Sequence, residues 1–347
     1  MKTSKYFFIG FILFVFVWVI YLFNSFLLTM AIGILLAVST ANLNIKMLEV
    51  TNGRHILSAT FTTLILLCLF LAPLFYAVIE LAKYATNFNM SNVQLVVKYI
   101  QNFDFNLPER FEFLEPRIKN FILSFDYNAL IKQVAGYASN VGKSGAKFVI
   151  DLALIIVFYF FANMYGKSLM QFIRDTLPIE ASKINSITSE VRNTMSVVLY
   201  STLATAVLQG VLYGSMISFF GYDGFLMGIL YAFASMIPIV GGLIVYIPMC
   251  IYELATGDVK AAIFIFLYTA IVIGTIADNF VKPFIIKFIN SKLVSSPANI
   301  NELIIFFAMI AGLSTFGFWG IILGPAIVTL FIALLNAYRT LIQEFGG

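Results

Sequence analysis

Charged residues are scarce in this sequence. Of its 347 residues, 21 are Lys or Arg and 17 are Asp or Glu, so that only 11% are charged. A soluble domain is roughly one-quarter charged, and this chain has too few charges to cover a surface that faces water. The net charge of +4 is spread over the chain rather than gathered in a basic patch, so we expect no nucleic-acid partner.

Histidine and cysteine are nearly absent, which limits the chemistry that the chain can perform. The one histidine is His55, and the two cysteines, Cys68 and Cys250, lie inside apolar runs. A histidine-based zinc site and a disulfide framework are therefore not expected. We predict no metal and no cofactor.

The sequence also lacks the motifs of ATP-driven proteins and of intramembrane enzymes. It contains no Gly-x-x-x-x-Gly-Lys-Ser/Thr loop for nucleotide phosphates and no His-Glu-x-x-His pair for a metal. Tyr222-Asp223 resembles one half of an intramembrane aspartyl protease site, but the Gly-x-Gly-Asp partner is missing. We therefore predict that the protein is not an enzyme.

Hydrophobic residues dominate instead, at 61% of the chain, and the mean hydropathy is +0.96. They come in blocks near the ~20 residues that a helix needs to cross a ~30 Å hydrocarbon core. These blocks lack the two-residue alternation of outer-membrane barrel strands. The sequence predicts an all-α polytopic membrane protein with about eight hydrophobic segments, embedded in the lipid bilayer of the cell inner membrane.

Three parts follow one another along the chain. Residues 1–83 carry the first three predicted transmembrane helices, and Lys2 and Lys5 ahead of them place the N-terminus in the cytoplasm. Residues 84–146 are rich in charge and show apolar stripes at helical spacing, which predicts an amphipathic helical insertion outside the membrane. Residues 147–347 carry helices four to eight. We expect the insertion to pack on the membrane surface, on the core or on a neighbouring subunit.

Small residues recur at the four-residue spacing that lets helix backbones approach closely in lipid. The pairs are Gly210-x-x-x-Gly214, Gly224-x-x-x-Gly228 and Gly320-x-x-x-Gly324. They indicate positions where helices of the bundle touch.

Two of the later hydrophobic segments are interrupted. The sixth, residues 224–254, contains Pro238, Gly241 and Gly242 near its centre. The eighth, residues 302–338, is interrupted by four glycines and a proline: Gly312, Gly317, Gly320, Gly324 and Pro325. As straight helices these segments would be roughly 46 and 55 Å long, well beyond a ~30 Å core. They therefore either tilt and protrude or fold back as re-entrant hairpins.

Breaks of this kind free backbone groups inside the membrane, where they are tolerated only against protein or a water-filled cavity. Broken helices often form the substrate or ion site of secondary transporters. We therefore take the residues at both breaks as candidate binding residues. The alternative is that a proline kink merely shapes a packed bundle.

The lysines after the seventh segment distinguish straight crossings from hairpins. With eight simple crossings and a cytoplasmic N-terminus, Lys282, Lys287 and Lys292 would face the outside, against the positive-inside rule. If both broken segments enter and leave on one side, these lysines and Arg339 lie inside. The 84–146 insertion remains outside in this arrangement.

Polar residues accompany the seventh apolar run, residues 261–277, where Asp278-Asn279 leads into Lys282-Pro283. A carboxylate is costly at membrane depth, so its default interpretation is functional. Here it lies near an expected helix end, which leaves three interpretations. Asp278 contacts a substrate or ion, pairs with Lys282 one turn away, or is simply solvated.

Other polar residues have simpler interpretations. Gln209, in the fifth segment, is expected to bond either a substrate or a neighbouring helix. Asp151, Glu253 and Glu302 stand at segment ends, where we expect them to be solvated at the membrane interface.

The C-terminal half contains a series of motifs. In order, they are Pro238-x-x-Gly241, Pro248, Asp278-Asn279-x-x-x-Pro283, Pro297, Gly312-x-x-x-Phe316-Gly317-x-x-Gly320 and Leu323-Gly324-Pro325. In this combination the sequence resembles the autoinducer-2 exporter family of bacterial permeases, and the order of segments agrees over nearly the whole chain. Gly242 stands where the family often has proline, and Ser296 where it often has histidine. These departures leave the cargo open.

The resemblance implies a secondary transporter of small molecules, without an ATPase and in a homo-oligomer. Members of the family have been linked to efflux of autoinducer-2, and others to sodium–proton antiport. We therefore expect export of an autoinducer-2-like signal or a related polar solute by alternating access, with residues 224–338 moving as in an elevator transporter. The alternatives are a sodium(lithium)/proton antiporter and, from another class, a membrane scaffold acting through residues 84–146.

Overall fold

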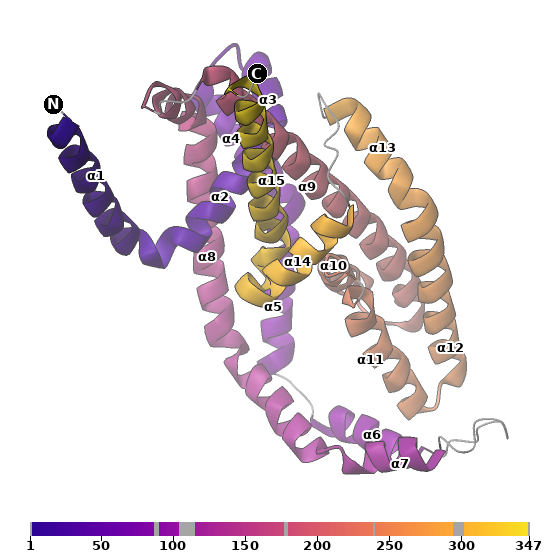
Figure 1. Cartoon of the computed structure of the whole chain (residues 1–347). Helices are drawn as coiled ribbons and strands as arrows, with labels where there is room; N and C mark the ends of the chain where they lie inside the picture. Colours follow the sequence, from indigo (N-terminus) through magenta and orange to yellow (C-terminus); the bar gives the residue numbers. More distant parts are fainter. Residues whose placement is uncertain are drawn as a thin grey trace. The chain divides into compact units, whose positions relative to one another are not determined.

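A computed structural model describes residues 2–86, 90–103, 115–176, 180–238, 240–293 and 302–345. Within these ranges every regular element is a helix (Figure 1). The protein is an all-α polytopic membrane protein, which confirms the predicted fold class. Ser296 and Pro297 of the sequence motifs lie outside the described residues.

Among the described residues, six helical stretches are long and apolar enough to cross a membrane. They are Tyr6–Ser39, His55–Tyr84, Gly145–Thr176, Ser182–Phe220, Val259–Ile289 and Leu303–Arg339. Two further apolar helices, Gly224–Ser235 and Gly241–Thr256, are shorter. The sixth predicted segment is thus interrupted, as expected, while the first two predicted segments form one stretch.

The chain divides into two compact units, each built from separated pieces of sequence. Unit 1 consists of Met1–Leu69, Ile150–Leu199 and Asn290–Gly347, and unit 2 of Phe70–Val149 and Tyr200–Ile289. This grouping follows contacts rather than chain order. It therefore differs from the three consecutive parts expected above, and that division stays a prediction.

Unit 1 begins with α1 (Lys2–Phe23), η1 (Asn24–Phe26) and α2 (Leu27–Ser39). The described side chains of α1, from Tyr6 onward, are all exposed although almost all are apolar. A helix that is apolar on every side and exposed is suited to a lipid environment. Figure 1 shows the chain bending at η1, where the first two predicted segments meet.

Hydrogen bonds from polar side chains join further helices of unit 1. These helices are α3 (Ala41–Val50), α4 (His55–Leu66), the C-terminal part of α8 (Tyr127–Thr176) and the start of α9 (Ala181–Ile217). The hydroxyls of Thr40 and Tyr159 lie 2.7 Å apart. Asn44 donates to the carbonyl oxygen of Asn163 at 3.1 Å. Such interhelical bonds hold helices together where lipid offers no hydrophobic driving force.

The last elements of unit 1 are α14 (Glu302–Phe316), η6 (Gly317–Trp319) and α15 (Gly320–Phe345). Gly312 and Gly324 are twelve residues apart, which is ~18 Å along a straight helix. A Cβ atom at Gly312 would nevertheless lie 3.0 Å from the Gly324 Cα. The eighth segment is therefore a hairpin, and it turns at Gly317, whose φ of +62° favours glycine.

The remaining elements, most of them in unit 2, are η2 (Leu67–Leu71), α5 (Ala72–Thr86), α6 (Met90–Gln101), α7 (Glu115–Ser124), η4 (Ser218–Phe220), α10 (Gly224–Ser235), α11 (Gly241–Thr256), α12 (Val259–Tyr268), η5 (Thr269–Val281) and α13 (Lys282–Leu293). α6 packs on α11, and Val97 of its apolar stripe is buried. This part of the predicted insertion therefore packs on its own chain. The helix of the fourth span starts at Tyr127, inside that insertion.

Proline inside the stretch His55–Tyr84 is accommodated by a π-helical turn. In an α-helix the ring of Pro73 would collide with the carbonyl of Leu69, and its nitrogen donates no hydrogen bond. The preceding turn is η2, a π-helix. Its i→i+5 bonding widens the backbone at the point where the clash would occur.

The glycine pairs of unit 2 pack against each other. A Cβ atom at Gly210 would lie 2.6 Å from the Gly228 carbonyl oxygen, and one at Gly228 would lie 2.7 Å from that of Gly210. Gly214 and Gly224 approach each other even more closely. α9 and α10 therefore touch backbone to backbone, as the four-residue spacing predicts.

We expect Gly210→Ala to destabilise the protein. The added methyl group would lie 2.6 Å from the Gly228 oxygen and 2.8 Å from the Ala232 Cβ, and overpacking of this kind costs about 1–3 kcal/mol. Thermal unfolding in detergent should show a Tm several degrees below wild type.

Gly166→Ala is the matched control, because nothing lies within 4 Å of a Cβ atom at that position and alanine favours a helix over glycine. Its Tm should equal or exceed that of the wild type. Equal Tm values for the Gly210 and Gly166 variants would contradict the backbone contact.

Candidate functional site

Asp278 lies inside a long continuous helix. α12, η5 and α13 follow one another without a break (Figure 1), and together they supply the stretch Val259–Ile289. The expectation that Asp278 lies near a helix end is therefore wrong. Polar residues and a proline suggested an end there, but the helix continues past Pro283 to Leu293.

The π-helical geometry of η5 explains why Pro283 does not end this helix. In an α-helix its ring would collide with the carbonyl of Asn279. In η5, the Thr275 hydroxyl donates to the carbonyl oxygen of Ala270, five residues earlier, at 3.0 Å. π-helical segments are rare and often occur at functional sites. This geometry makes η5 a candidate for function.

Gln209 of α9 holds the carboxylate of Asp278. The Gln209 Nε2 donates to the Asp278 Oδ1 at 2.6 Å, and Gln209 is only 5% exposed. Lys282 lies one turn further along, near enough for its charge to act on Asp278. No salt bridge joins these two described side chains, however. A neutral amide therefore binds the acid, and no ion pair cancels its charge.

The interruption of the sixth segment is a turn between α10 and α11, and Pro238 lies in this turn. A Cβ atom at Gly241 would overlap the carbonyl oxygen of Ala234, and one at Gly242 would lie 2.6 Å from the Tyr231 hydroxyl. Glycine at both positions lets the start of α11 pack directly on the end of α10. The two helices form a compact hairpin.

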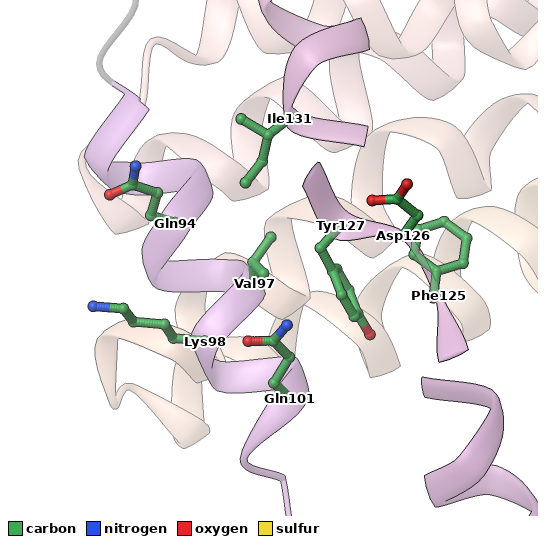
Figure 2. Close-up of a pocket in the computed structure, with 8 residues that line it drawn as sticks. All are labelled: Gln94, Val97, Lys98, Gln101, Phe125, Asp126, Tyr127 and Ile131. Carbon is green, nitrogen blue, oxygen red and sulfur yellow. The ribbon is translucent and has the colours of Figure 1, made fainter. Parts of the chain in front are cut away.

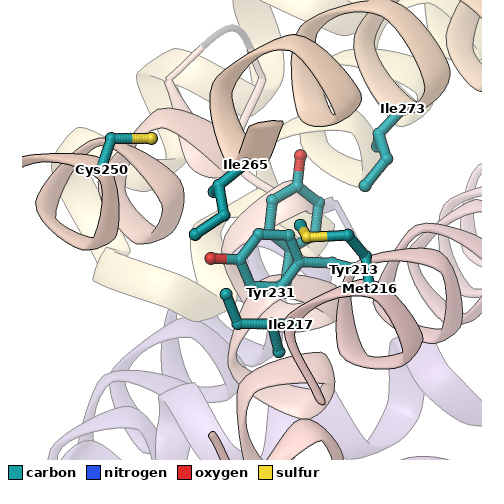
Figure 3. Packing of buried hydrophobic residues seen from close by; sticks show 7 residues of the cluster. All are labelled: Tyr213, Met216, Ile217, Tyr231, Cys250, Ile265 and Ile273. Atoms are coloured by element: carbon teal, nitrogen blue, oxygen red, sulfur yellow. The ribbon is translucent and has the colours of Figure 1, made fainter. Parts of the chain in front are cut away.

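Tyr213 of α9 and Tyr231 of α10 stack in the core of unit 2. Their ring centroids lie 4.4 Å apart, with 18° between the ring planes. Figure 3 shows them within the buried cluster, whose other members are Met216, Ile217, Cys250, Ile265 and Ile273. The cluster joins α9, the α10–α11 hairpin and the helix of Asp278. It therefore fixes the elements that carry the Gln209–Asp278 pair.

The candidate residues of unit 2 have different surroundings. Gln209 and Asp278 are in direct contact, whereas Asn279 is exposed and donates to the carbonyl oxygen of Thr275, on its own helix, at 3.0 Å. Lys282 and Pro283 are exposed as well. The structure thus brings together two of the predicted polar residues and leaves the others on the helix surface.

The candidate residues of unit 1 all belong to the α14–α15 hairpin. Gly312, Gly320, Gly324 and Pro325 are buried, and Gly317 is exposed at the turn. A Cβ atom at Gly320 would overlap the carbonyl of Gly312. Gly312, Gly320 and Gly324 share close backbone contact, as Gly241 does in unit 2.

Glu253 of α11 is part of a buried pair that the sequence did not indicate. It is 8% exposed and accepts a hydrogen bond from the Tyr222 hydroxyl. Burial, with a further contribution from this bond, raises the pKa of Tyr222, so the phenol stays protonated and is the donor. The expectation that Glu253 is solvated is therefore wrong. The pair joins residues 31 positions apart, and no local pattern marks it.

Asp223, next to Tyr222, has a structural role. Its carboxylate accepts a hydrogen bond from the backbone N–H of Leu226 at 3.0 Å and caps α10. An N-cap of this kind satisfies one of the free N–H groups at the start of a helix. The partial resemblance of Tyr222-Asp223 to a protease motif therefore has a structural explanation.

The insertion has a cavity of its own, of about 330 Å³, between α6 and the start of α8 (Figure 2). Its lining residues are Gln94, Val97, Lys98, Gln101, Phe125, Asp126, Tyr127 and Ile131. They combine an ammonium, a carboxylate and two amides with aromatic and aliphatic side chains. This mixture can hold a small polar molecule.

The chain is a multi-pass helical protein with a carboxylate inside a membrane-spanning stretch. An amide binds this carboxylate, and an interrupted segment that forms a hairpin packs near it. These are features of a membrane transporter. The family model described as AI-2E family transporter matches residues 9–340. The chain belongs to this family.

Relatives with similar sequences carry matching descriptions. A "Putative transport protein" of Helicobacter pylori strain J99 is 35% identical over 339 residues, which cover 98% of this chain and 96% of the relative. A protein of the same description from H. pylori strain 26695 is 34% identical, with 98% and 97% covered. One from Aquifex aeolicus is 28% identical, with 69% and 68% covered.

We expect Gln209→Leu to destabilise the protein because the Asp278 carboxylate loses its donor. An unsatisfied buried polar group costs about 1–3 kcal/mol. Adding Asp278→Leu should restore part of the loss, since partners in a hydrogen bond couple by about 0.5–3 kcal/mol. Thermal unfolding in lipid nanodiscs measures both effects.

Gln171→Leu, at an exposed position of α8, controls for the general effect of replacing an amide. Its Tm should stay close to that of the wild type. If the effects of Gln209→Leu and Asp278→Leu simply add, the bond does not contribute to stability as described.

Proposed function

We propose that the protein is a secondary transporter that moves a small polar solute or an ion by alternating access, with the Gln209–Asp278 pair at its binding site. The observation that carries this proposal is the 2.6 Å bond between these side chains inside a membrane-spanning stretch. A carboxylate inside a membrane-spanning stretch is energetically costly, and its presence there supports a functional role.

The α10–α11 hairpin supports the proposal through the length of its helices. α10 has 12 residues and α11 has 16, so they reach roughly 18 and 24 Å. Each is shorter than the ~30 Å hydrocarbon core. As re-entrant elements, α10–α11 and α14–α15 would bring helix ends and free backbone groups to the middle of the membrane, where transporters bind cargo.

The cargo that we favour is an autoinducer-2-like signal or a related polar solute, which the cell exports. Gln209 retains a free amide oxygen and Asp278 a second carboxylate oxygen, and both accept hydrogen bonds from hydroxyl groups. The elevator form of the mechanism assigns the movement to residues 224–338. Backbone contacts at Gly241 and Gly312 keep each hairpin rigid enough to move as a body.

A sodium(lithium)/proton antiporter is the second candidate, and the environment of Asp278 favours it specifically. The carboxylate has an amide donor but no salt bridge to Lys282. A carboxylate without a fixed counter-ion suits a site that alternates between a cation and a proton. Neither candidate function involves enzyme chemistry.

A scaffold role through residues 84–146 is the candidate from a different class. The mixed lining of the cavity between α6 and α8 gives the insertion a surface that a partner or ligand can recognise. Within the transporter proposal, the protein lies in the inner membrane as a homo-oligomer, and its N-terminus is cytoplasmic. The exposed apolar faces of α1 provide area for lipid and for a second copy.

We expect Asp278→Asn to reduce transport strongly in liposomes that contain the purified protein. The assay has two readouts, which are autoinducer-2 release and sodium- or lithium-driven proton movement. Solute release without ion-driven flux supports the exporter, and ion-driven flux lost in Asp278→Asn supports the antiporter. Asp151→Asn, at the start of the fourth span, should retain wild-type activity in either case.

Wild-type activity of Asp278→Asn in both readouts would show that Asp278 is not part of the binding site. Absence of activity of the wild type in both readouts would contradict the proposed cargoes. Deletion of residues 90–124 that abolishes a cellular phenotype, while Asp278→Asn does not, would support the scaffold role instead.

The re-entrant arrangement predicts that a cysteine placed at Ser291 is labelled from the cytoplasmic side. The background for this experiment is Cys68→Ser with Cys250→Ala, because Cys68 is exposed and would react itself. An impermeant maleimide added to inside-out vesicles should then modify residue 291. Reaction from the periplasmic side alone would show that the broken segments cross the membrane.

A further inference from the structure

Three buried hydroxyl groups of unit 2 have no hydrogen-bond partner among the described residues. They belong to Thr205 and Tyr213 on α9 and to Thr269 on η5. Their side chains are 6%, 0% and 2% exposed, respectively. An unsatisfied buried hydroxyl costs about 1–3 kcal/mol, so three in one unit require an explanation.

The buried hydroxyls of Thr62 and Tyr159, by contrast, are satisfied. Thr62 bonds the carbonyl oxygen of Ser58 at 2.8 Å, one turn earlier. Tyr159 shares a bond with Thr40. Threonine in a helix readily bonds its own backbone in this way. Thr205 and Thr269 do not do so, and their hydroxyls are therefore turned away from the carbonyl groups of their own helices.

The hydroxyls of α9 lie on one line with Gln209. Thr205, Gln209 and Tyr213 are spaced four residues apart, which places them on one face of the helix with about 5–6 Å between successive Cβ atoms. The two unpartnered hydroxyls therefore belong to the helix face that carries Gln209, one turn before it and one turn after it, and Gln209 bonds Asp278.

The third unpartnered hydroxyl lies on the helix that contacts α9. Tyr268, the residue before Thr269, donates to the carbonyl oxygen of Leu212, the residue before Tyr213, at 3.5 Å. Ile265, Thr269 and Ile273 recur every four residues and are all buried. Thr269 is thus a hydroxyl in an otherwise apolar buried face.

We propose that these hydroxyls bind internal water molecules, which form a buried hydrated line along α9 from Thr205 past Gln209 to Tyr213. Buried waters typically make about three hydrogen bonds to polar groups that otherwise lack partners. The line brings water, and with it proton exchange, to Asp278 inside the membrane-spanning bundle. This proposal rests on the proposed function only in assigning Asp278 a role in transport.

Radiolytic footprinting of the full-length protein in nanodiscs tests this proposal, and its probe is water itself. Ionising radiation converts bound water to hydroxyl radicals, which modify the side chains that hold it. Tyr213 and Tyr159 are both 0% exposed, but the Tyr159 hydroxyl is bonded to Thr40. We expect Tyr213 to be modified several-fold faster than Tyr159. Equal, slow modification of both tyrosines would overturn the proposal.

Thr205→Val tests whether the waters form one line. Valine matches threonine in shape but cannot hold water, so the variant should fold and Tyr213 modification should fall. Thr315→Val, at an exposed threonine bonded to its own helix, should leave it unchanged. Unchanged modification in Thr205→Val would refute a continuous line. Neither readout requires transport, so failure of the transport assays is distinguishable from failure here.

Discussion

Every backbone polar group inside a membrane must find its partner within the protein, and the architecture of this chain depends on that constraint. It accounts for the helical class and for the way in which prolines are accommodated. η2 precedes Pro73 and η5 precedes Pro283, and in both places a wider π-helical turn lets the helix continue. It also explains why the interrupted segments become tight hairpins, since a hairpin covers its own backbone.

Close backbone contact is the second organising feature. In unit 2 the glycines of α9 and α10 face each other, and in unit 1 those of α14 and α15 do so. Lipid provides no hydrophobic gain for bringing helices together, so this contact and interhelical polar bonds supply the cohesion. The same polar bonds place Gln209 against Asp278. Cohesion and the candidate site therefore use the same kind of interaction.

The sequence alone predicted the features that depend on local pattern. Block length predicted the membrane helices, and glycine and proline predicted both interruptions. Features that depend on contacts between distant residues were not predictable. The bond from Gln209 to Asp278 and that from Tyr222 to Glu253 join positions 69 and 31 residues apart. The helix end expected near Asp278 was wrong because a π-helical run absorbs the proline that normally marks an end.

The 13-residue length of η5 has a consequence for Asp278. Replacing one of its i→i+5 hydrogen bonds with an ordinary i→i+4 bond would shift the register by one residue. Such a shift would rotate the residues that follow it by about 100° around the helix axis. A shift of one residue ahead of Asp278 would thus turn its carboxylate away from α9.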